Sequence, residues 1–361
     1  MILYIHIPFC HRICPYCSFY KHTPGDADKS AFIEAILHEA NVAATSGRLA
    51  QINTLYLGGG TPSMLSPKHL TELFEGLHAE LSLENTHVTL EANPATFGTS
   101  KAKLFKDLGV NRISLGIQSF NAHVLKTLGR EHSPDEARES VRILQDTGME
   151  EVNIDLMFSI PGQSLSDWEH SLDTAVSLSP DHISAYNLTY EEDTPFFDKL
   201  RHHENEALNA EMFNLAHDKL TGAGFHHYET SNYARPDKES LHNRAYWQGD
   251  DYLGLGPSAV STIDGRRWKN IPDTANYIHA IQTVGHAKSE EENIDAEAYR
   301  IERIALLLRT SSGIPEKYLS ESPESSVHQL IDNQLAEISN GNLRLINEGR
   351  LLVDSIAEQL V

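Results

Sequence analysis

Six short apolar runs alternate with amphipathic stretches in the first half of the chain, and this alternation limits the fold more than any other feature. The runs cover residues 3–7, 54–59, 87–92, 112–117, 151–158 and 182–188. Runs of this length with few polar breaks are typical of strands buried on both faces. Helix start signals such as Ser66-Pro67 and Ser133-Pro134 lie between them. We therefore predict an α/β fold of parallel βα units, and six units favour a partial (β/α)6 barrel over a closed barrel of eight.

The alternation stops near residue 190, which indicates a domain boundary. We expect a barrel over residues 1–190, an irregular extension over 191–290 and a C-terminal α+β domain over 291–361. The extension is expected to begin with a helix over 204–221 and to continue as an aromatic, loop-like stretch over 225–268.

The last domain is expected to be winged-helix-like. Its sequence predicts helices over 295–309 and 323–339, and then a hairpin in which 343–346 pairs with 350–353 around Glu348-Gly349. The domain offers few basic residues for phosphates, so we expect it to contact a protein or to gate a substrate site and not to bind DNA.

The chain is strongly acidic. It has 51 acidic and 29 basic residues, for a formal net charge of -22, which opposes binding to nucleic acid. No apolar run approaches the length of about 20 residues that crosses a bilayer, and the first residues do not resemble a secretion signal. We expect no transmembrane segment and a cytoplasmic location, with membrane association only through a partner.

The three cysteines of the chain all lie in one short segment. Cys10, Cys14 and Cys17 form a C-x3-C-x2-C pattern directly after the first predicted strand, so they cannot staple distant segments. Three thiolates from one loop can bind three corners of an iron–sulfur cubane. The fourth iron then has no protein ligand, and the amino and carboxylate groups of a small molecule can occupy it.

Two other interpretations of these cysteines remain open. Zinc usually has four protein ligands, and one of His6, His11 or His22 could complete a zinc knuckle. The three cysteines could also be buried structural residues, although His11, Arg12 and Pro15 make the segment a polar loop.

The cysteine pattern and its place after the first strand resemble the radical S-adenosylmethionine superfamily. This resemblance implies a [4Fe–4S] cluster on Cys10, Cys14 and Cys17, S-adenosylmethionine on its open iron, and an electron donor such as flavodoxin or ferredoxin. The segment Gly58–Ser63 resembles the GGGTP loop of that family, in which glycines allow the backbone to approach the methionine group closely. The alternative for this segment is an ordinary glycine-rich turn.

Other strand-end residues resemble positions that bind S-adenosylmethionine in the porphyrin-related branch of the superfamily. Asp155 could hold ribose hydroxyls, Gln118 offers a donor and an acceptor, and Arg130 could pair with the methionine carboxylate. Each of these three residues could instead satisfy nearby backbone groups, and Tyr4 and Tyr16, which also match ligand-near positions, could simply pack. The full set implied by the resemblance is Tyr4, Tyr16, Gly59, Gly60, Thr61, Glu91, Gln118, Arg130 and Asp155.

Within that branch the chain resembles the HemW-like haem chaperones more than its enzymes, the oxygen-independent coproporphyrinogen III dehydrogenases. The enzymes have a fourth cysteine where this chain has Phe19, and an extension before the first strand, which here begins at Leu3. Residues 241–247 also match the H-N-x-x-Y-W motif of the chaperones. The resemblance implies haem and haem-accepting proteins as partners, with the dehydrogenase activity as the alternative, and it assigns no catalytic residue.

The H-N-x-x-Y-W motif also provides candidate haem contacts. An imidazole can ligate iron while aromatic faces cover the macrocycle. We take His242 as the candidate iron ligand, and His226 and His227 are weaker candidates. Structural roles are the alternative for all of them. The candidate haem contacts are His242, Asn243, Tyr246 and Trp247.

Overall fold

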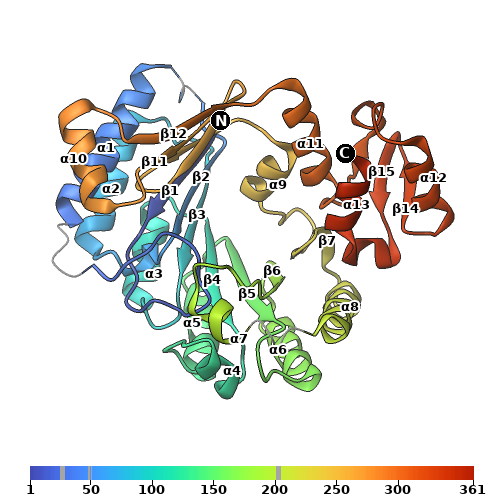
Figure 1. The fold of residues 1–361 in the computed structure, drawn as a ribbon. Coiled ribbons are helices and arrows are strands. Elements are labelled where there is room, and N and C mark those ends of the chain that lie inside the picture. The colour runs from blue at the N-terminus through green and yellow to red at the C-terminus, as the bar shows by residue number, and fades with distance from the viewer. Residues whose placement is uncertain (25–28, 48, 50, 201–204) are drawn as a thin grey trace.

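The computed structural model describes residues 1–24, 29–47, 49, 51–200 and 205–361. Six neighbouring parallel strands form its centre and follow one another in chain order (Figure 1). They are β1 (Ile2–Ile7), β2 (Thr54–Gly59), β3 (His87–Ala92), β4 (Arg112–Gln118), β5 (Glu151–Phe158) and β6 (His182–Asn187). The predicted α/β fold with six parallel strands is confirmed.

The connecting helices cover the outer face of these strands. They are α1 (Lys29–Thr45), α2 (Pro67–Glu80), α3 (Thr99–Asp107), α4 (Ala122–Thr127), α5 (Pro134–Asp146) and α6 (Leu165–Ser177). The two helix start signals hold, since Ser66 and Ser133 are N-caps and a proline follows each. At Ser133 the side chain of Glu136 completes a capping box, which satisfies two otherwise unpaired N–H groups.

The sheet does not end at residue 190. Later strands extend it at both edges, and the complete order is β12-β11-β10-β9-β1-β2-β3-β4-β5-β6-β8-β7. The added strands are β7 (His226–Glu229), β8 (Asn232–Ala234), β9 (Tyr252–Leu255), β10 (Val260–Ile263), β11 (Arg266–Asn270) and β12 (Lys288–Asn293). The helices of this segment are α7 (Pro195–Leu200), α8 (Glu206–Gly222), α9 (Leu241–Gln248) and α10 (Thr274–Val284).

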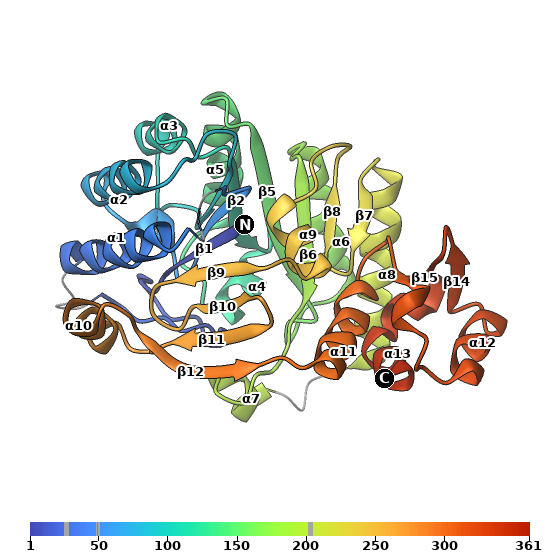
Figure 2. The same cartoon turned by 90° about the horizontal axis from the view of Figure 1, so that it is seen from above.

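The irregular structure expected for 191–290 is therefore wrong. The strands of this segment are short. Strand β12 is exposed along its whole length, so its sequence shows no alternation of apolar and polar residues that would predict a strand. Strand β9 pairs in parallel with β1, which places this late segment beside the first strand of the barrel (Figure 2). The three domain limits remain predictions.

The C-terminal part has a small hydrophobic core of its own, which includes Ile304, Leu330 and Leu343. Its elements are α11 (Ala296–Leu307), β13 (Ile314–Pro315), α12 (Glu324–Asp332), β14 (Ala336–Ser339), β15 (Asn342–Leu345) and α13 (Val353–Leu360). A helix, a short strand, a second helix and a hairpin follow one another, and the winged-helix assignment remains a prediction.

The hairpin predicted in this part is wrong in its position. The observed hairpin pairs β14 with β15, and the residues from Asn347 to Leu351 form a 3-10 helix. Asn340 and Gly341 turn the chain with φ angles of 53° and 75°. Asn-Gly is the preferred pair for such a two-residue turn, and the predicted helix over 323–339 ends before it, at Asp332.

Across the described ranges of the chain, no helix combines the length and the apolar character needed to span a membrane.

Candidate functional site

The carboxyl ends of β1 to β6 surround a cavity of about 160 Å³. Parallel strands bring their carboxyl ends to one edge of a sheet, so residues far apart in the sequence meet there. Nearly all the residues predicted to hold the cluster and S-adenosylmethionine line it: Cys10, Cys14, Tyr16, Cys17, Gly59, Gly60, Thr61, Glu91, Gln118, Arg130 and Asp155.

Backbone hydrogen bonds fold the cysteine loop over this edge. The N–H of His22 donates to the carbonyl of Pro8 at 2.9 Å, and the N–H of Cys10 donates to the carbonyl of His22 at 3.0 Å. A turn between Cys14 and Cys17 is closed by a bond of 3.2 Å from the N–H of Cys17. All three half-buried thiols therefore face one cavity.

The surroundings of the thiols suit metal-bound sulfur. Burial raises the pKa of Cys10 and of Cys17, and a bound metal would overcome this effect by holding the thiolate form. The Thr61 hydroxyl donates to Sγ of Cys10 at 3.6 Å. Hydrogen bonds of this kind are expected to tune an iron–sulfur centre.

The zinc knuckle has little support in the geometry. His6 Nε2 bonds the carbonyl of Tyr20 at 2.7 Å, His11 Nδ1 lies 2.7 Å from Glu131, and His22 Nε2 lies 2.8 Å from the hydroxyl of Thr274. Within the described residues, no three His, Cys, Asp or Glu side chains converge as one metal ion requires.

The glycine loop packs tightly against the cysteine loop. A Cβ atom on Gly59, whose φ is +104°, would lie 2.4 Å from the ring of His6, and one on Gly60 would lie 2.8 Å from the carbonyl oxygens of Ile7 and Phe9. Glycine is therefore required at both positions for space. This packing brings the backbone of the loop to the cavity, which an ordinary surface turn would not need.

Glu91 lies at the end of β3 and is held from two sides. The Tyr56 hydroxyl donates to Oε1 at 2.8 Å, and the N–H of Gly59 donates to Oε2 at 3.0 Å. Burial raises the pKa of Glu91 to about 7, although the bond from Tyr56 opposes the shift. Glu91 can therefore exchange a proton near neutral pH, and it ties the glycine loop to the sheet.

Asp155, in β5, faces the interior of the barrel. The Ser114 hydroxyl contacts its two oxygens at 3.2 and 3.1 Å, and the Asn153 amide donates at 2.7 Å. Burial raises the pKa of Asp155. Asp155 and Glu91 also line a second cavity of about 300 Å³ inside the barrel, so both carboxyl groups lie between the two cavities.

Arg130 has a donor that no protein group uses. Its Nη2 donates to Oδ1 of Asn93 and to the carbonyl of Gly116, both at 2.6 Å, but its buried Nε has no hydrogen-bond partner among the described residues. A buried cation with a spare donor at the cavity wall fits an anionic ligand group such as a carboxylate. This observation supports the fit between the site and S-adenosylmethionine.

Gln118 has a strained backbone. Its φ is 70°, and the pairing of β4 with β5 shifts register at this point. The side chain accepts a hydrogen bond of 2.5 Å from the Tyr186 hydroxyl. Strain of this kind in a residue other than glycine is typical of functional sites.

The two predicted tyrosines differ. Tyr16 lines the cavity and packs on Phe196 with ring centroids 6.2 Å apart. Tyr4 does not belong to the residues that line it. Its hydroxyl bonds Nδ1 of His6 at 3.0 Å, and its ring stacks on Tyr56. The geometry therefore favours packing for Tyr4, which lies three residues before the end of β1.

Asn93 and Tyr186 line the cavity and were not predicted. Asn93 donates to the Thr61 hydroxyl at 3.0 Å and accepts from Arg130, so it joins the glycine loop to the predicted carboxylate-binding cation. A signal existed for Asn93, because it follows Glu91 by two residues at the same strand end. Tyr186, near the end of β6, had a similar signal.

The predicted haem contacts divide into two groups. His242 is only 2% exposed, its Nδ1 bonds the Thr54 hydroxyl at 2.8 Å, and its ring stacks on Tyr56 at 4.8 Å. Burial lowers its pKa to about 3. Asn243, Tyr246 and Trp247 instead line a separate cavity. The structure thus does not bring His242 into the same cavity as its three motif neighbours.

The two weaker histidine candidates lie elsewhere. His226 is exposed on β7, and His227 stacks on Tyr233 with ring centroids 4.1 Å apart while its Nδ1 lies 3.0 Å from Nδ1 of His217. The contacts of His227 support a structural role for that residue.

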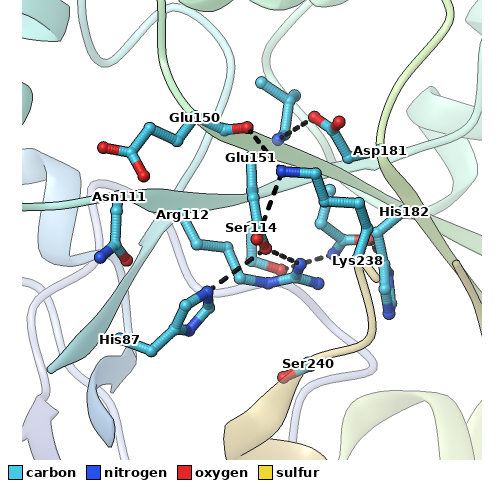
Figure 3. A network of polar contacts seen from close by, with 12 residues as sticks. His87, Asn111, Arg112, Ser114, Glu150, Glu151, Asp181, His182, Lys238 and Ser240 are labelled. Carbon is cyan, nitrogen blue, oxygen red and sulfur yellow. Dashed lines mark hydrogen bonds and ion pairs between the residues drawn. The ribbon is translucent and has the colours of Figure 1, made fainter. Parts of the chain in front are cut away.

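A polar network closes the amino end of the barrel (Figure 3). Arg112 and Glu151, which start β4 and β5, form an ion pair of 3.0 Å, and His87 and Lys238 contact the same carboxylate at 3.3 and 3.5 Å. Burial opposes the charge of Glu151, but the bond from His87 and the charge of Arg112 lower its pKa to about 2. The network fixes the end of the barrel opposite the cysteines.

A chain of hydrogen bonds connects this end of the barrel to α9. Asn153 and Nδ1 of His182 are 2.6 Å apart, Nε2 of His182 bonds the Tyr228 hydroxyl at 2.8 Å, and that hydroxyl accepts from the N–H of Ser240 at 3.2 Å. Because Ser240 caps α9, the barrel interior positions this helix.

Comparisons with known proteins agree with this geometry. Residues 4–175 match the family model of the Radical SAM superfamily. The chain is 33% identical to the heme chaperone HemW of Bacillus subtilis, over 98% of this chain and 97% of that protein. It is 39% identical to the heme chaperone HemW of Escherichia coli, over 73% and 71% of the two chains. It is also 32% identical to the mitochondrial radical S-adenosyl methionine domain-containing protein 1 of Danio rerio, over 98% and 85%.

A solved structure shares the fold. The coproporphyrinogen III oxidase HemN of Escherichia coli, described as a radical SAM enzyme, superposes with a TM-score of 0.85 over 99% of this chain and 89% of its own. The two sequences are 21% identical, so this likeness concerns the fold alone.

Proposed function

The chain belongs to the heme chaperone HemW family of radical SAM proteins, and from this premise we propose that it binds haem and transfers it to acceptor proteins. We also propose that Cys10, Cys14 and Cys17 hold a [4Fe–4S] cluster whose open iron binds S-adenosylmethionine. One observation carries the cofactor assignment: the three thiols, the glycine loop and the unpartnered Nε of Arg130 meet at one cavity.

The chemistry of the cluster would be the transfer of one electron to the bound sulfonium when an electron donor reduces it. The residues of the chain bind and orient the cofactor. Arg130 pairs with the methionine carboxylate, and Gly59, Gly60 and Thr61 present backbone groups to the methionine end.

The remaining cavity residues would hold the nucleoside end. Asp155 and Glu91 accept from hydroxyl groups, and Gln118 offers both a donor and an acceptor. Tyr16 covers one side of the cavity. Because Ser114, Asn153 and Tyr56 already fix both carboxyl groups, their oxygens are oriented before the ligand arrives.

The dehydrogenase activity is the less favoured alternative. Phe19, at the position of the fourth cysteine of those enzymes, lines the cavity and is 67% exposed. An exposed aromatic ring at the mouth of the cavity supplies no thiol, and the fold shared with HemN does not transfer its reaction.

The partners of this function are haem, haem-accepting proteins and an electron donor such as flavodoxin or ferredoxin. We place the protein in the cytoplasm, where a reducing environment would maintain the thiols, with membrane contact through an acceptor.

The test of this proposal uses protein reconstituted with iron and sulfide under anaerobic conditions. Haem titration followed by the Soret band should show saturable binding, and an apo haem protein added afterwards should take up the haem. In parallel, coproporphyrinogen III with S-adenosylmethionine and a reductant should give no vinyl product by mass spectrometry. Vinyl formation would support the dehydrogenase instead, and absence of haem binding would refute the chaperone function.

A further inference from the structure

A cavity of about 150 Å³ lies between β7, the last strand at one edge of the large sheet, and the C-terminal part of the chain. Its other walls come from the end of α11, from β15 and from the start of α13, and Figure 1 shows β7, β15 and α13 close together. Backbone bonds join the two sides, since the N–H of Thr230 donates to the carbonyl of Arg309 at 2.8 Å and the N–H of Ser311 donates to the carbonyl of Tyr228 at 2.9 Å. Small-molecule sites usually have volumes of about 300–1,000 Å³, so this cavity suits only a small ligand.

Three arginine side chains line this cavity. Arg309 follows α11, Arg344 lies in β15, and Arg350 lies in the 3-10 helix before α13. A guanidinium group keeps its charge and can only donate hydrogen bonds. In a chain with only 29 basic residues against 51 acidic ones, three such cations around one small cavity require a specific reason.

The carboxylates that contact these arginines lie outside the cavity. Asp354 contacts Arg309 and its side chain is 79% exposed, whereas Glu337 contacts Arg344 and its side chain is 40% exposed. Exposed pairs of this kind are weak because water competes with them. Arg350 forms no ion pair with any carboxylate of the described residues. The positive charge inside the cavity is therefore poorly compensated.

Arg350 is held by two histidines that supply no negative charge. Its Nη1 lies 3.1 Å from Nε2 of His217, which must accept because the guanidinium can only donate. The proton of His217 is then on Nδ1 and is donated to Nδ1 of His227 at 3.0 Å, and Nε2 of His227 donates to the carbonyl of Thr230 at 3.1 Å. Burial lowers the pKa of both rings, to about 4 for His227, which agrees with two neutral imidazoles. The histidines thus orient the guanidinium but leave its charge available to a ligand.

Glu229 is the one carboxyl group among the described residues that line the cavity. It is 2% exposed, and its oxygens accept from the N–H of Ser231 at 3.2 Å and from the Asn232 amide. Burial raises the pKa of Glu229 to about 7, so near neutral pH many molecules carry it as a neutral acid. In that form it can donate to an anion and does not repel it.

We infer that this cavity binds a small phosphate group, held by Arg309, Arg344 and Arg350. A phosphate offers up to four oxygens to three guanidinium groups, whereas a carboxylate offers two, and arginine is well suited to both the charge and the geometry of phosphate. The inference does not depend on the proposed haem transfer or on the cofactor site, since the described residues that line this cavity and the cysteine cavity are entirely different. A bound phosphate would add contacts between the sheet edge and the C-terminal part, and would stabilise the folded chain by mass action.

The test titrates inorganic phosphate into the full-length reconstituted protein at pH 7 by calorimetry, with chloride keeping the ionic strength constant. The wild-type protein should show one saturable site, and Arg350→Gln should bind about tenfold more weakly. Arg344→Gln, at a half-exposed position of β15 that is not needed for folding, should weaken binding in the same direction. Arg142→Gln, which removes an exposed charge on α5, should leave the affinity unchanged. No binding to the wild-type protein, or wild-type affinity in both cavity variants, would overturn the site.

A second comparison tests the location with a change in the opposite direction. At pH 8, where Glu229 is largely ionised, Glu229→Gln should bind phosphate about threefold or more tightly than the wild-type protein, because the amide removes a negative charge from the wall. Unchanged or weaker binding in this variant would overturn the location. The circular dichroism melting curve of each variant checks that it is folded.

The choice of ligand identifies the source of the phosphate group. Tighter binding of glycerol 3-phosphate than of inorganic phosphate would assign the cavity to a phosphorylated metabolite, and the reverse order would assign it to free phosphate. Malonate, a small dicarboxylate, should bind at least about tenfold more weakly than either. Equal affinity for malonate would overturn the assignment to phosphate.

Discussion

The Nη1 atom of Arg130 lies 3.7 Å from the Sγ atom of Cys14, so the cation proposed to bind the methionine carboxylate also contacts a proposed cluster ligand. Arg130 follows α4, whereas Cys14 lies in the loop after β1. One side chain therefore connects the cysteine loop with the strand ends that line the cavity. Under the proposed function, this contact would couple the arrangement of the thiols to the binding of S-adenosylmethionine.

Replacing Arg130 with glutamine should separate these two roles. We expect S-adenosylmethionine to bind about tenfold or more weakly, because a charged hydrogen bond to its carboxylate is lost. Iron content should stay near the wild-type value, since no thiol is removed. Equilibrium dialysis with labelled S-adenosylmethionine and an iron assay measure the two quantities. Arg142→Gln, at an exposed position of α5, is the control, and unchanged cofactor affinity in Arg130→Gln would contradict the assigned role.

Replacing Cys10 with serine should remove the cluster. We expect the brown absorbance of the anaerobically reconstituted protein and its S-adenosylmethionine binding to disappear together, because each thiolate holds one iron. Phe19→Ser changes a residue of the same loop that provides no ligand, and it should retain iron. Zinc in place of iron in the wild-type protein, or retained iron in Cys10→Ser, would contradict the ligand set.

The central fold was predictable because its strands are buried on both faces. All seven residues of β4 are buried, and such runs are visible without knowledge of their partners. The edge strand β12, with sequence KSEEEN, is defined only by its pairing with β11, and no local pattern reveals it. The hairpin of β14 and β15 did have a local sequence signal. Its turn residues Asn340-Gly341 are a stronger hairpin signal than Glu348-Gly349, the pair on which the prediction was based.

The candidate site was predictable where one loop or one strand end carries it. The cysteine motif is local, and parallel strands necessarily bring Glu91 and Asp155 to the same edge. The surroundings of His242 depend instead on Thr54 and Tyr56, which come from a strand nearly 200 residues earlier. A motif in the sequence does not distinguish an exposed imidazole from a buried one, and only packing determines this.

Removing the carboxylate of Glu151 should destabilise the amino end of the barrel. Glu151→Gln leaves the buried Arg112 without its charged partner, and we expect the free energy of unfolding to fall by about 3 kcal/mol. The exposed pair of Glu139 and Arg142 provides the control. Glu139→Gln should change the free energy of unfolding by less than about 0.5 kcal/mol. Urea unfolding measures both, and equal stabilities of the two variants would show that the network of Figure 3 contributes little.

Stability should also depend on pH through Glu229. Burial raises the pKa of this residue to about 7, against the opposing bond from Asn232. An acid with a raised folded-state pKa holds its proton more tightly in the folded protein than in the unfolded chain. The stability gained in this way is fully present below the unfolded-state pKa and is lost as the pH rises through the folded-state pKa of about 7. Glu229→Gln should therefore reduce the loss of stability between about pH 5 and about pH 8, by up to about 3 kcal/mol.

Urea unfolding of the cluster-free protein at the two pH values measures this difference. Glu91, whose pKa is also raised to about 7, remains in the Glu229→Gln variant, so part of the pH dependence should persist. A variant with the same pH dependence as the wild type would show that Glu229 is ionised in the folded protein at both pH values.

The role of His242 can be tested with a substitution that keeps its buried hydrogen bond. In His242→Asn the amide can replace Nδ1 as partner of the Thr54 hydroxyl, but it cannot replace Nε2, the atom that would ligate iron and that has no partner in the described structure. Because His242 is buried and does not line the cavity of Asn243, Tyr246 and Trp247, we expect the Soret maximum to be unchanged and the haem affinity to stay within about threefold of the wild-type value. Tyr246→Ala, which removes a wall of the cavity, should weaken binding by more. A shifted Soret maximum in His242→Asn, with Tyr246→Ala unaffected, would identify His242 as the iron ligand and would require α9 to rearrange when haem binds.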